Sequence, residues 1–533
     1  MYITPEMNKQ RKLREQPTQI RLWDGDWRLI DEIEGDYEHE FEFVNNDAGS
    51  GTLVLPLDHP TAEKLVNPLE WPTQSLYVTF DREGVRWSGR VATAKVVDTA
   101  REDRQVELYL THDYLKLKEL LVWANPFLPA EVQFPKAWML YGPARWAVAT
   151  TLFVNLLRKN NSTWMLPDDP LDVLQWADLD MSDWSMAVKP VKLLQDKSLS
   201  AVVSSRFKNF HDCVETVLGD AQLTIECRRY LDGDPDPIPG KKLRHGCLVF
   251  EVVDKSGWNK QTSFFGSMRD GLVRQVRKIN ADGLSESVET LPVIENPAEY
   301  SKPTFRGTMP EAPWVVLEHG DDTGVEATEF EYTPAGPSQF VTGGSSMPGV
   351  NEALKASIIS LGGLLGSFVG YSSVGAAAGE LLEPLYSDVF AAFMAHKHRD
   401  RIQEQGWDYP FEYWVDGSDK AYTLSSISAL RKAKYETRER FACTVTMNNG
   451  APYWVGPTGS GDFFVGDRVA VHALGMAEDT LFVEQVQSLR YSSSPDTRDW
   501  EIEVGSPEIV SGLEYLSKRF EDSTSALREL GVW

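Results

Sequence analysis

The chain has 533 residues, a mass of 60.0 kDa and a formal net charge of −26, from 79 acidic and 53 basic side chains. A chain of this length has room for about three to five domains with cores of their own. The acidic balance argues against a tight nucleic-acid binder, which needs a basic face, and against adsorption to anionic lipid. Residues 1–19 are polar and charged, so we expect synthesis in a cytoplasm without a secretory signal peptide.

The first part of the chain shows the alternation of apolar and polar residues that is typical of β-strands. Turn signals at Asp24-Gly25-Asp26, at 45–49 and at 82–84 separate short apolar runs. About six or seven strands within roughly 100 residues favour a small closed or semi-closed barrel. We therefore predict an N-terminal β-barrel domain over residues 1–119.

The middle of the chain mixes helical and strand patterns. Residues 144–160 carry apolar side chains at helical spacing, and 210–220 predict a second, shorter helix before a strand at 223–231. These elements define a mixed helical and β domain over 120–240, followed by a β region over 241–294. Residues 295–350 are rich in Pro, Gly and acidic residues, so we expect an extended and mostly irregular connector there.

Residues 356–379 carry no charge, and they lie within a segment, 351–405, that we expect to be helical. Within this segment, one face of the first predicted helix carries apolar residues at spacings of three and four. Another face of that helix carries a glycine every four residues, which lets helix backbones approach closely. Pro384 suits the first turn of a second helix, which we expect to end in basic residues before a Gly406 C-cap. The predicted helix-packing or membrane-engaging residues are Ile358, Leu361, Gly362, Leu365, Gly366, Phe368 and Gly370.

Three interpretations of this uncharged run remain open. It is a buried helix at a subunit interface, a segment that inserts into a membrane when exposed, or a constitutive transmembrane helix. Its length is sufficient for a bilayer, which takes about 20 residues. Its many Gly and Ser residues and the lack of a second span argue against the third interpretation.

Residues 406–507 again alternate as strands, with a strong hairpin signal at Asn449-Gly450. This region has about the size of the first, and we predict a second β-barrel domain. Residues 508–533 are predicted to form a C-terminal amphipathic helix. The fold class expected from the whole pattern is multidomain α+β, mainly β.

The sequence contains no signature of catalysis, of a cofactor or of a metal site. Four cysteines form no CxxC pair, which favours buried thiols over a metal site. The glycine-rich residues 455–467 lack the Lys-Ser/Thr pair of a phosphate loop, so they predict a hairpin loop, with Phe463 to Val465 continuing as a strand. His396 and His398 are two apart, which places them apart on a helix, at a solvated basic end. Residues 320–331 are expected to form a solvated acidic loop.

Seventeen tryptophans admit two interpretations. Tryptophan is a frequent anchor in cores and protein interfaces, which is the interpretation we favour for a chain of this size. Its flat ring is also a platform for sugars, which leaves carbohydrate stacking as the alternative.

Several long motifs resemble one protein family. They are SIISLGGLLGSFVG, LLEPLYSDVFAAFMAHKHRDR, GWDYPFEYWVDG, YTLSSISALR and PYWVG with GDFFVGDRV, and the start of the chain, RLWDGDWRLI with GSGTLVLPLDHP, is similar too. The chain resembles the large minor tail proteins of long, non-contractile-tailed phages of actinobacteria. The likeness covers most of the chain and is densest over 351–470, while residues 295–349 carry no motif of it.

The resemblance implies a structural virion protein at the distal end of the tail: a baseplate hub that is a homotrimer, caps the tail tube, adapts its sixfold symmetry to threefold, and gates the channel for genome delivery. Its implied partners are the distal tail protein, the tape-measure protein and other minor tail proteins, with DNA passing through unbound and with host membrane contact during infection as a further candidate. The alternative function is a tail-associated cell-wall hydrolase or a carbohydrate-binding adhesion protein.

Overall fold

The computed structural model describes residue 14 and residues 16–98, 104–125, 137–160, 181–198 and 200–256. With interruptions, it also describes stretches within 128–135, 260–343 and 393–505. The seven predicted helix-packing residues, the Asn449-Gly450 turn and the predicted C-terminal helix lie outside the described residues. Within the described part, no helix combines the length and the apolar composition that a membrane span requires.

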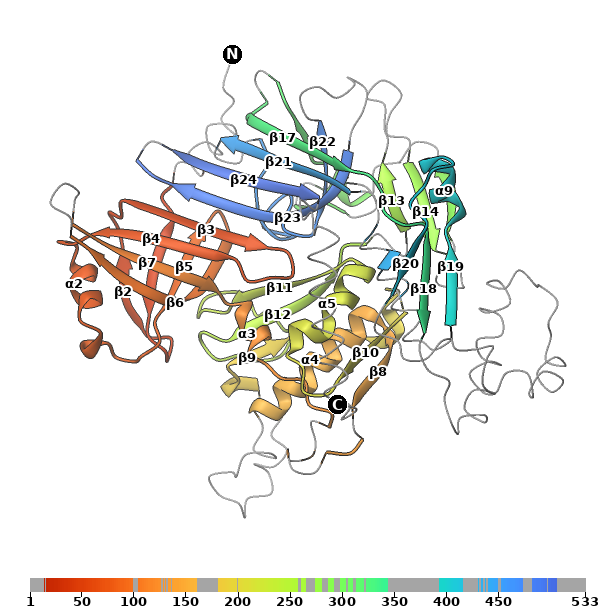
Figure 1. Cartoon of the computed structure of the whole chain (residues 1–533). Helices are drawn as coiled ribbons and strands as arrows, with labels where there is room; N and C mark the ends of the chain where they lie inside the picture. Colours follow the sequence, from red (N-terminus) through yellow and green to blue (C-terminus); the bar gives the residue numbers. More distant parts are fainter. Residues whose placement is uncertain are drawn as a thin grey trace.

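The N-terminal region is a run of antiparallel strands, as the alternation predicts (Figure 1). In the third strand, His39, Phe41 and Phe43 are buried while their neighbours are more exposed, which is the two-residue period of a sheet with one face on the core. The helices α2 (Pro60–Val66) and η1 (Pro68–Glu70) follow the fourth strand. The strands are β1 (Gln19–Trp23), β2 (Leu29–Ile33), β3 (Glu38–Val44), β4 (Ser50–Pro56), β5 (Tyr77–Arg82), β6 (Val85–Val97) and β7 (Gln105–His112).

The C-terminal strands continue the same sheet. Residues 488–493 of β23 pair antiparallel with residues 39–44 of β3, which gives the strand order β17-β21-β24-β23-β3-β4-β7-β6-β5-β1-β2, with β22 and β16 attached beside β23. The strands are β16 (Val316–Glu318), β17 (Val325–Thr333), β21 (Arg440–Asn448), β22 (Arg468–His472), β23 (Phe482–Ser493) and β24 (Arg498–Gly505).

The prediction of two separate barrels is therefore wrong. The described strands form one 13-stranded sheet that is not closed, with β2 and β17 at its two ends. The physical reason is that β3 and β23 would each expose a row of unpaired backbone groups in a free-standing unit. Pairing the two edges satisfies both rows at once. The fold is mainly β, as predicted.

One hydrophobic core serves both halves of this sheet. Phe41 of β3 lies at its centre, with its ring centroid 5.3 Å from that of Tyr491, 5.9 Å from that of Trp500 and 5.2 Å from that of Phe80. Trp87 fits beside them because Gly89 has no side chain: a Cβ there would lie 2.3 Å from the Trp87 ring.

The middle of the chain forms a module with a second core. The helices α4 (Ala144–Asn160) and α5 (Phe210–Ala221) confirm the two predicted helices, and both pack against two small sheets. Asn209 caps α5, since its side chain accepts a hydrogen bond from the Asp212 N–H. The sheets contain β8 (Trp138–Pro143) with β10 (Ser200–Ser205), and β11 (Leu223–Arg229) with β12 (Leu248–Asp254) and β9 (Met186–Val188); short helices are α3 (Leu115–Lys118), η3 (Met181–Asp183) and η4 (Leu193–Gln195).

In the segment 295–350, which was predicted to be mostly irregular, some of the described residues lie in regular elements. These elements are η5 (Ala298–Ser301), β16, β17 and β18 (Gln339–Gly343). The nine-residue β17 is held by pairing with β21, so a partner distant in the chain orders a segment with weak local preferences.

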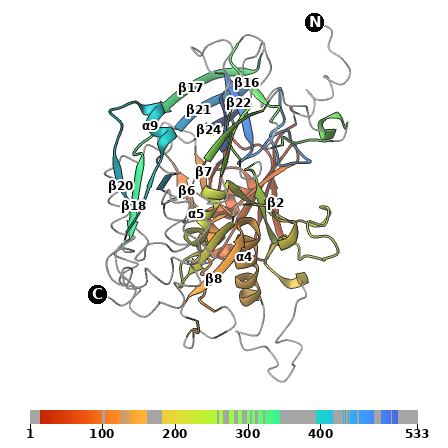
Figure 2. The same ribbon diagram turned by 90° about the vertical axis from the view of Figure 1, so that its right-hand side faces the viewer.

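The second helix, which was predicted to begin near Pro384 and to end in basic residues before Gly406, is corrected in its described part. Residues Phe393–Lys397 form a strand, β19, and the helix α9 (Arg399–Gln405) begins only after it. Gly406 is a helix C-cap, as predicted, with φ of 85°. β19 is a strand because it pairs with β18, which β20 (Glu412–Trp414) joins on its other side. Figure 2 shows this small sheet and α9 at one side of the molecule. A further sheet consists of β13 (Lys260–Phe264), β14 (Arg274–Ile279) and β15 (Glu286–Leu291).

Replacing Phe41 with Ala is expected to lower the free energy of unfolding by about 3 to 5 kcal/mol, because the cavity opens in the core that both halves share. Urea denaturation of the purified chain measures this. Tyr37→Ala is the matched control, since Tyr37 is 40% exposed. A loss below about 1 kcal/mol for Phe41→Ala would contradict a shared core.

Candidate functional site: a buried polar junction around β11

The described structure brings several buried charges together around β11. This strand belongs to the middle module, and it contacts β6 of the N-terminal half of the large sheet. Figure 1 shows β11 between the middle module and the large sheet. We call the polar contacts along and around it the β11 junction, and they involve Asn45, Asn46, Asp113, Thr224, Glu226, Arg229, Lys255 and Asp467.

Arg229, at the end of β11, joins the N-terminal half to the module. Its Nε and Nη2 atoms each donate a hydrogen bond of 2.7 Å to the Asp113 carboxylate, and its Nη1 donates to the Gly246 carbonyl at 2.8 Å. The guanidinium also lies over the Trp27 ring, 4.4 Å from its centroid. Burial opposes ionisation of Asp113, but Arg229 and a hydrogen bond from Ser88 outweigh it and hold the pKa of Asp113 below its ordinary value.

Lys255, just after β12, joins the C-terminal half to the module. Its ammonium group donates to Asp467 at 2.6 Å and lies 3.1 Å from the Glu226 carboxylate. Lys255 and Asp467 are buried, with side chains 3% and 2% exposed. Burial opposes the charge on Lys255, but the two carboxylates outweigh it and raise its pKa. Burial raises the pKa of Glu226, and the negative charge of Asp467 adds to this effect, whereas Lys255 opposes it.

The β3–β4 turn contacts the start of β11. Asn46 donates to the Leu223 carbonyl at 2.7 Å and accepts from the Ile225 N–H at 2.9 Å, so its side-chain amide pairs with the strand like a piece of backbone. Thr224 donates to Asn45 at 2.9 Å. Gly466 is required on the other side, because a Cβ there would lie 2.0 Å from the Thr224 hydroxyl.

His112 lies beside this junction and is buried. Its ring centroid is 5.4 Å from that of Trp87 and 5.7 Å from that of Phe43, and its Nε2 is 3.9 Å from the Cys227 sulfur. Burial lowers the pKa of His112 to about 4. The ring is therefore neutral in the folded protein at neutral pH.

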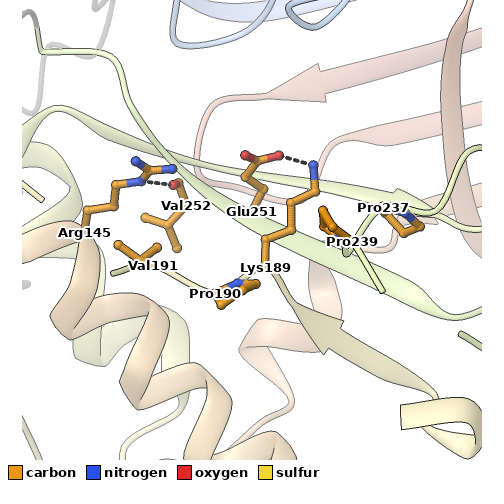
Figure 3. Close-up of a pocket in the computed structure, with 8 residues that line it drawn as sticks. All are labelled: Arg145, Lys189, Pro190, Val191, Pro237, Pro239, Glu251 and Val252. Carbon is orange, nitrogen blue, oxygen red and sulfur yellow. Dashed lines mark hydrogen bonds and ion pairs between the residues drawn. The ribbon is translucent and has the colours of Figure 1, made fainter. Parts of the chain in front are cut away.

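One shallow pocket of about 270 Å³ lies on the module, between the start of α4, β12 and the loop 232–240 (Figure 3). Arg145 donates from Nε to the Val252 carbonyl at 2.6 Å, and Lys189 pairs with Glu251 across its floor. Both cations in the pocket thus have at least one partner in its wall. The remaining lining residues are Pro190, Val191, Pro237 and Pro239.

The acidic loop predicted over 320–331 is wrong in part, because residues 325–331 belong to the strand β17, although most of their side chains are exposed, as predicted. Residues 455–467 form a compact loop, but the strand β22 begins at Arg468 and does not include Phe463 to Val465. The rings of His396 and His398 are in contact, 5.2 Å apart, because i and i+2 share a face once Phe393–Lys397 is a strand. Within the described residues no three His, Cys, Asp or Glu side chains are placed to hold a metal ion.

The sequence analysis did not identify the residues of the β11 junction. A weak signal was available, since Asp467 and Lys255 each adjoin apolar strands, in FFVGDRVAVH and CLVFEVVDK. A charge in such a position is often buried and paired. The local sequence, however, does not identify the partner of such a charge, because Lys255 and Asp467 lie 212 positions apart in the chain. All four cysteines are free thiols, and burial raises the pKa of Cys247 and of Cys443 to about 11.

A model of the family described as Siphovirus ReqiPepy6 Gp37-like protein matches residues 19–506. Over 563 residues, the chain is 36% identical to minor tail protein Gp28 of Mycobacterium phage L5, covering 96% of this chain and 94% of that protein. It is 36% identical over 574 residues to minor tail protein Gp28 of Mycobacterium phage D29, covering 98% and 96%.

The chain belongs to the Siphovirus ReqiPepy6 Gp37-like family. This confirms the resemblance to minor tail proteins of long-tailed phages and makes the chain a structural component of a phage tail. Among solved structures, a tail protein from Neisseria meningitidis MC58 has a TM-score of 0.41 and 11% identity, covering 92% of this chain and 97% of that one. A prophage tail protein from Shewanella oneidensis has a TM-score of 0.42 and 11% identity, covering 92% and 98%.

Replacing Lys255 with Met in this tail protein is expected to lower the free energy of unfolding by about 3 to 5 kcal/mol, because two buried carboxylates lose their cation. Lys64→Met is the control and should cost about 1 kcal/mol or less, since Lys64 pairs with Asp31 at the surface with 54% of its side chain exposed. The triple variant Lys255→Met, Glu226→Gln, Asp467→Asn should recover much of the loss. Equal losses for the Lys255 and Lys64 variants in urea denaturation would refute the assignment.

The family member should also lose stability in acid through His112. The unfolded chain binds a proton near the ordinary pKa of 6.5, whereas the folded chain binds it only near 4. Stability from this group is therefore complete above pH 6.5 and is lost as the pH falls toward 4, by about 3 kcal/mol in all. In His112→Phe, the urea midpoint should fall less steeply over this window than in the wild type. His245→Asn controls for loss of a histidine as such, and an unchanged slope in His112→Phe would contradict the prediction.

Proposed function

We propose that this minor tail protein is the hub of the tail tip: a homotrimer that caps the tail tube, adapts its sixfold symmetry to threefold, and gates the channel for genome delivery. The observation that carries the proposal is the pairing of β3 with β23. Through it, one chain holds an N-terminal and a C-terminal β region side by side in one sheet. Three copies would thus offer six β regions to a sixfold tube.

In a hub of this kind, the N-terminal and C-terminal β regions must keep a fixed position relative to each other. The β11 junction would hold them in that position. Arg229 ties the middle module to the N-terminal region and Lys255 ties it to the C-terminal region. Buried, fully paired charges tolerate little displacement, because an unpaired charge in the interior is costly. The net charge of −26 suits a conduit past which DNA moves without adsorbing.

We further propose that the uncharged run 356–379 packs helix against helix near the axis of the assembly. Gly343 and Phe393 are paired in β18 and β19, so residues 344–392 leave and re-enter the described structure at neighbouring positions. An apolar surface of this length would aggregate if it were free. The proposed partners of the trimer are the distal tail protein, the tape-measure protein and other minor tail proteins, and the host membrane during infection.

Three copies per particle are expected in an averaged image of the tail tip with this chain labelled. A tip with one copy or six copies would overturn the trimer. The hub proposal also assigns no catalytic residue to the chain. A zymogram in which the purified chain degrades host cell wall, with loss of that activity in a single carboxylate variant, would favour a hydrolase instead.

The mutation Leu365→Asp separates the two roles of the uncharged run. If the run is packed near the axis, a buried charge should block assembly, and Gly366→Leu should impair it as well by overpacking worth about 1 to 3 kcal/mol. If the run inserts into a membrane, Leu365→Asp particles should assemble and then fail to deliver DNA, since the charge costs about 2.5 to 3.5 kcal/mol at a bilayer centre. Particle yield and DNA ejection are the two measurements, and normal values of both for both variants would refute the proposal.

A further inference from the structure

The small sheet β19-β18-β20 has two unlike faces. One face is covered by α9: Phe340 is fully buried there, the Arg401 guanidinium lies 5.7 Å from its ring centroid, and the Tyr413 ring lies 6.4 Å away. This face therefore belongs to the interior of the protein.

The opposite face is open and has a regular composition. The strand register places Lys397, Gln339 and Glu412 in one row across the three strands. Within this row, the Gln339 amide donates a hydrogen bond of 2.8 Å to the Glu412 carboxylate. The next row contains Ala395, Val341 and Trp414. Because Lys397 and Glu412 are both exposed, this row presents an ammonium, an amide and a carboxylate to solvent.

Aromatic side chains gather beside these rows. Phe411 is 65% exposed and Trp414 45% exposed. The rings of Tyr409 and Phe411 are in contact, with centroids 5.1 Å apart, and the Lys397 ammonium lies 5.6 Å from the Tyr409 centroid. Lys397 thus links the aromatic residues to the polar row. We call this surface the aromatic face, and it contains Gln339, Lys397, Tyr409, Phe411, Glu412 and Trp414.

The chemistry of the aromatic face fits an uncharged, hydroxyl-rich ligand. The C–H face of a sugar ring is apolar and flat, so it packs on an aromatic ring, while its hydroxyl groups exchange hydrogen bonds with amide, carboxylate and ammonium groups. The positive charge of Lys397 and the negative charge of Glu412 cancel, so the row favours neither anionic nor cationic ligands. A polyanion would in addition be repelled by the net charge of −26.

The exposed apolar side chains of the middle module include two rings, Phe134 at 77% and Tyr141 at 60% exposed, besides aliphatic side chains. Leu194 of η4 is 97% exposed and Met139 of β8 is 72% exposed. Flexible aliphatic side chains suit protein contacts, but they offer no flat ring for a sugar to stack on. At the aromatic face, exposed rings occur together with planar polar groups.

We propose that the aromatic face binds a neutral polysaccharide of the host cell envelope. This inference rests on the proposed position of the protein at the tail tip, where it would meet that envelope. Binding at this face requires no conformational change in β18, β19 or β20, because the groups already lie in register on a paired sheet.

The test measures binding of the full-length chain to immobilised dextran, mannan and arabinogalactan, with dextran sulfate as the polyanionic comparison. We expect saturable binding to at least one neutral polymer, little dependence on salt, and no binding to dextran sulfate. Phe411→Ala and Trp414→Ala should each weaken binding by about tenfold. Lys397→Gln, which keeps a hydrogen-bonding side chain, should weaken it less. Tyr141→Ala on β8, with 60% of the tyrosine exposed, is the matched control and should bind as the wild type does.

Three results would overturn the inference: no saturable binding to any neutral polymer, binding that the Phe411 and Trp414 variants retain, or preferred binding to dextran sulfate. Thermal melts of each variant show that the chain still folds.

A fourth measurement asks whether the aromatic face is covered by another protein. In tails carrying Glu412→Cys, a maleimide should react at position 412, and protection there would point to a protein occupant and contradict the sugar site. Tails with three copies at the tip but without polysaccharide binding would refute this inference alone, whereas absence of the chain from the tip would refute the hub.

Discussion

The backbone pairing of β3 with β23 is the constraint on which the rest of the structure depends. Ser492 donates a hydrogen bond to Glu40 across this pair, although the two residues are 452 positions apart in the chain. The pairing removes two exposed strand edges and brings Tyr491 and Trp500 against Phe41. One sheet and one core thus replace two small units, each of which would have had less apolar surface to bury.

The β11 junction shows why a structural protein retains buried charges. A hydrophobic contact holds its strength through small sliding movements, whereas an ion pair in the interior is satisfied at one geometry only. The Arg229 fork on Asp113 and the Lys255 contacts with Asp467 and Glu226 set the module against both halves of the sheet. Acid is expected to weaken this arrangement, because His112 beside the junction must then take up a proton.

In the proposed hub, the sheet β19-β18-β20 would combine two tasks that are otherwise unrelated. Its β18 and β19 strands hold the two ends of the segment 344–392, which contains the uncharged run. Its open face carries the row of Lys397, Gln339 and Glu412 beside the aromatic side chains. In the proposed hub, one small sheet would therefore carry both the segment for the channel or membrane and a surface for the cell envelope.

The sequence by itself determined the local elements. The hairpins around Asp24-Gly25-Asp26 and residues 45–49 and the helices α4 and α5 occur as predicted, because turn residues and apolar periodicity act between near neighbours. The family resemblance was likewise carried by contiguous motifs. Only the tertiary structure decided that β3 pairs with β23, that β17 orders an acidic segment, that β19 is a strand, and that Lys255 meets Asp467. Each of these contacts joins residues far apart in the chain, and their stability comes from pairing and burial that no local pattern records.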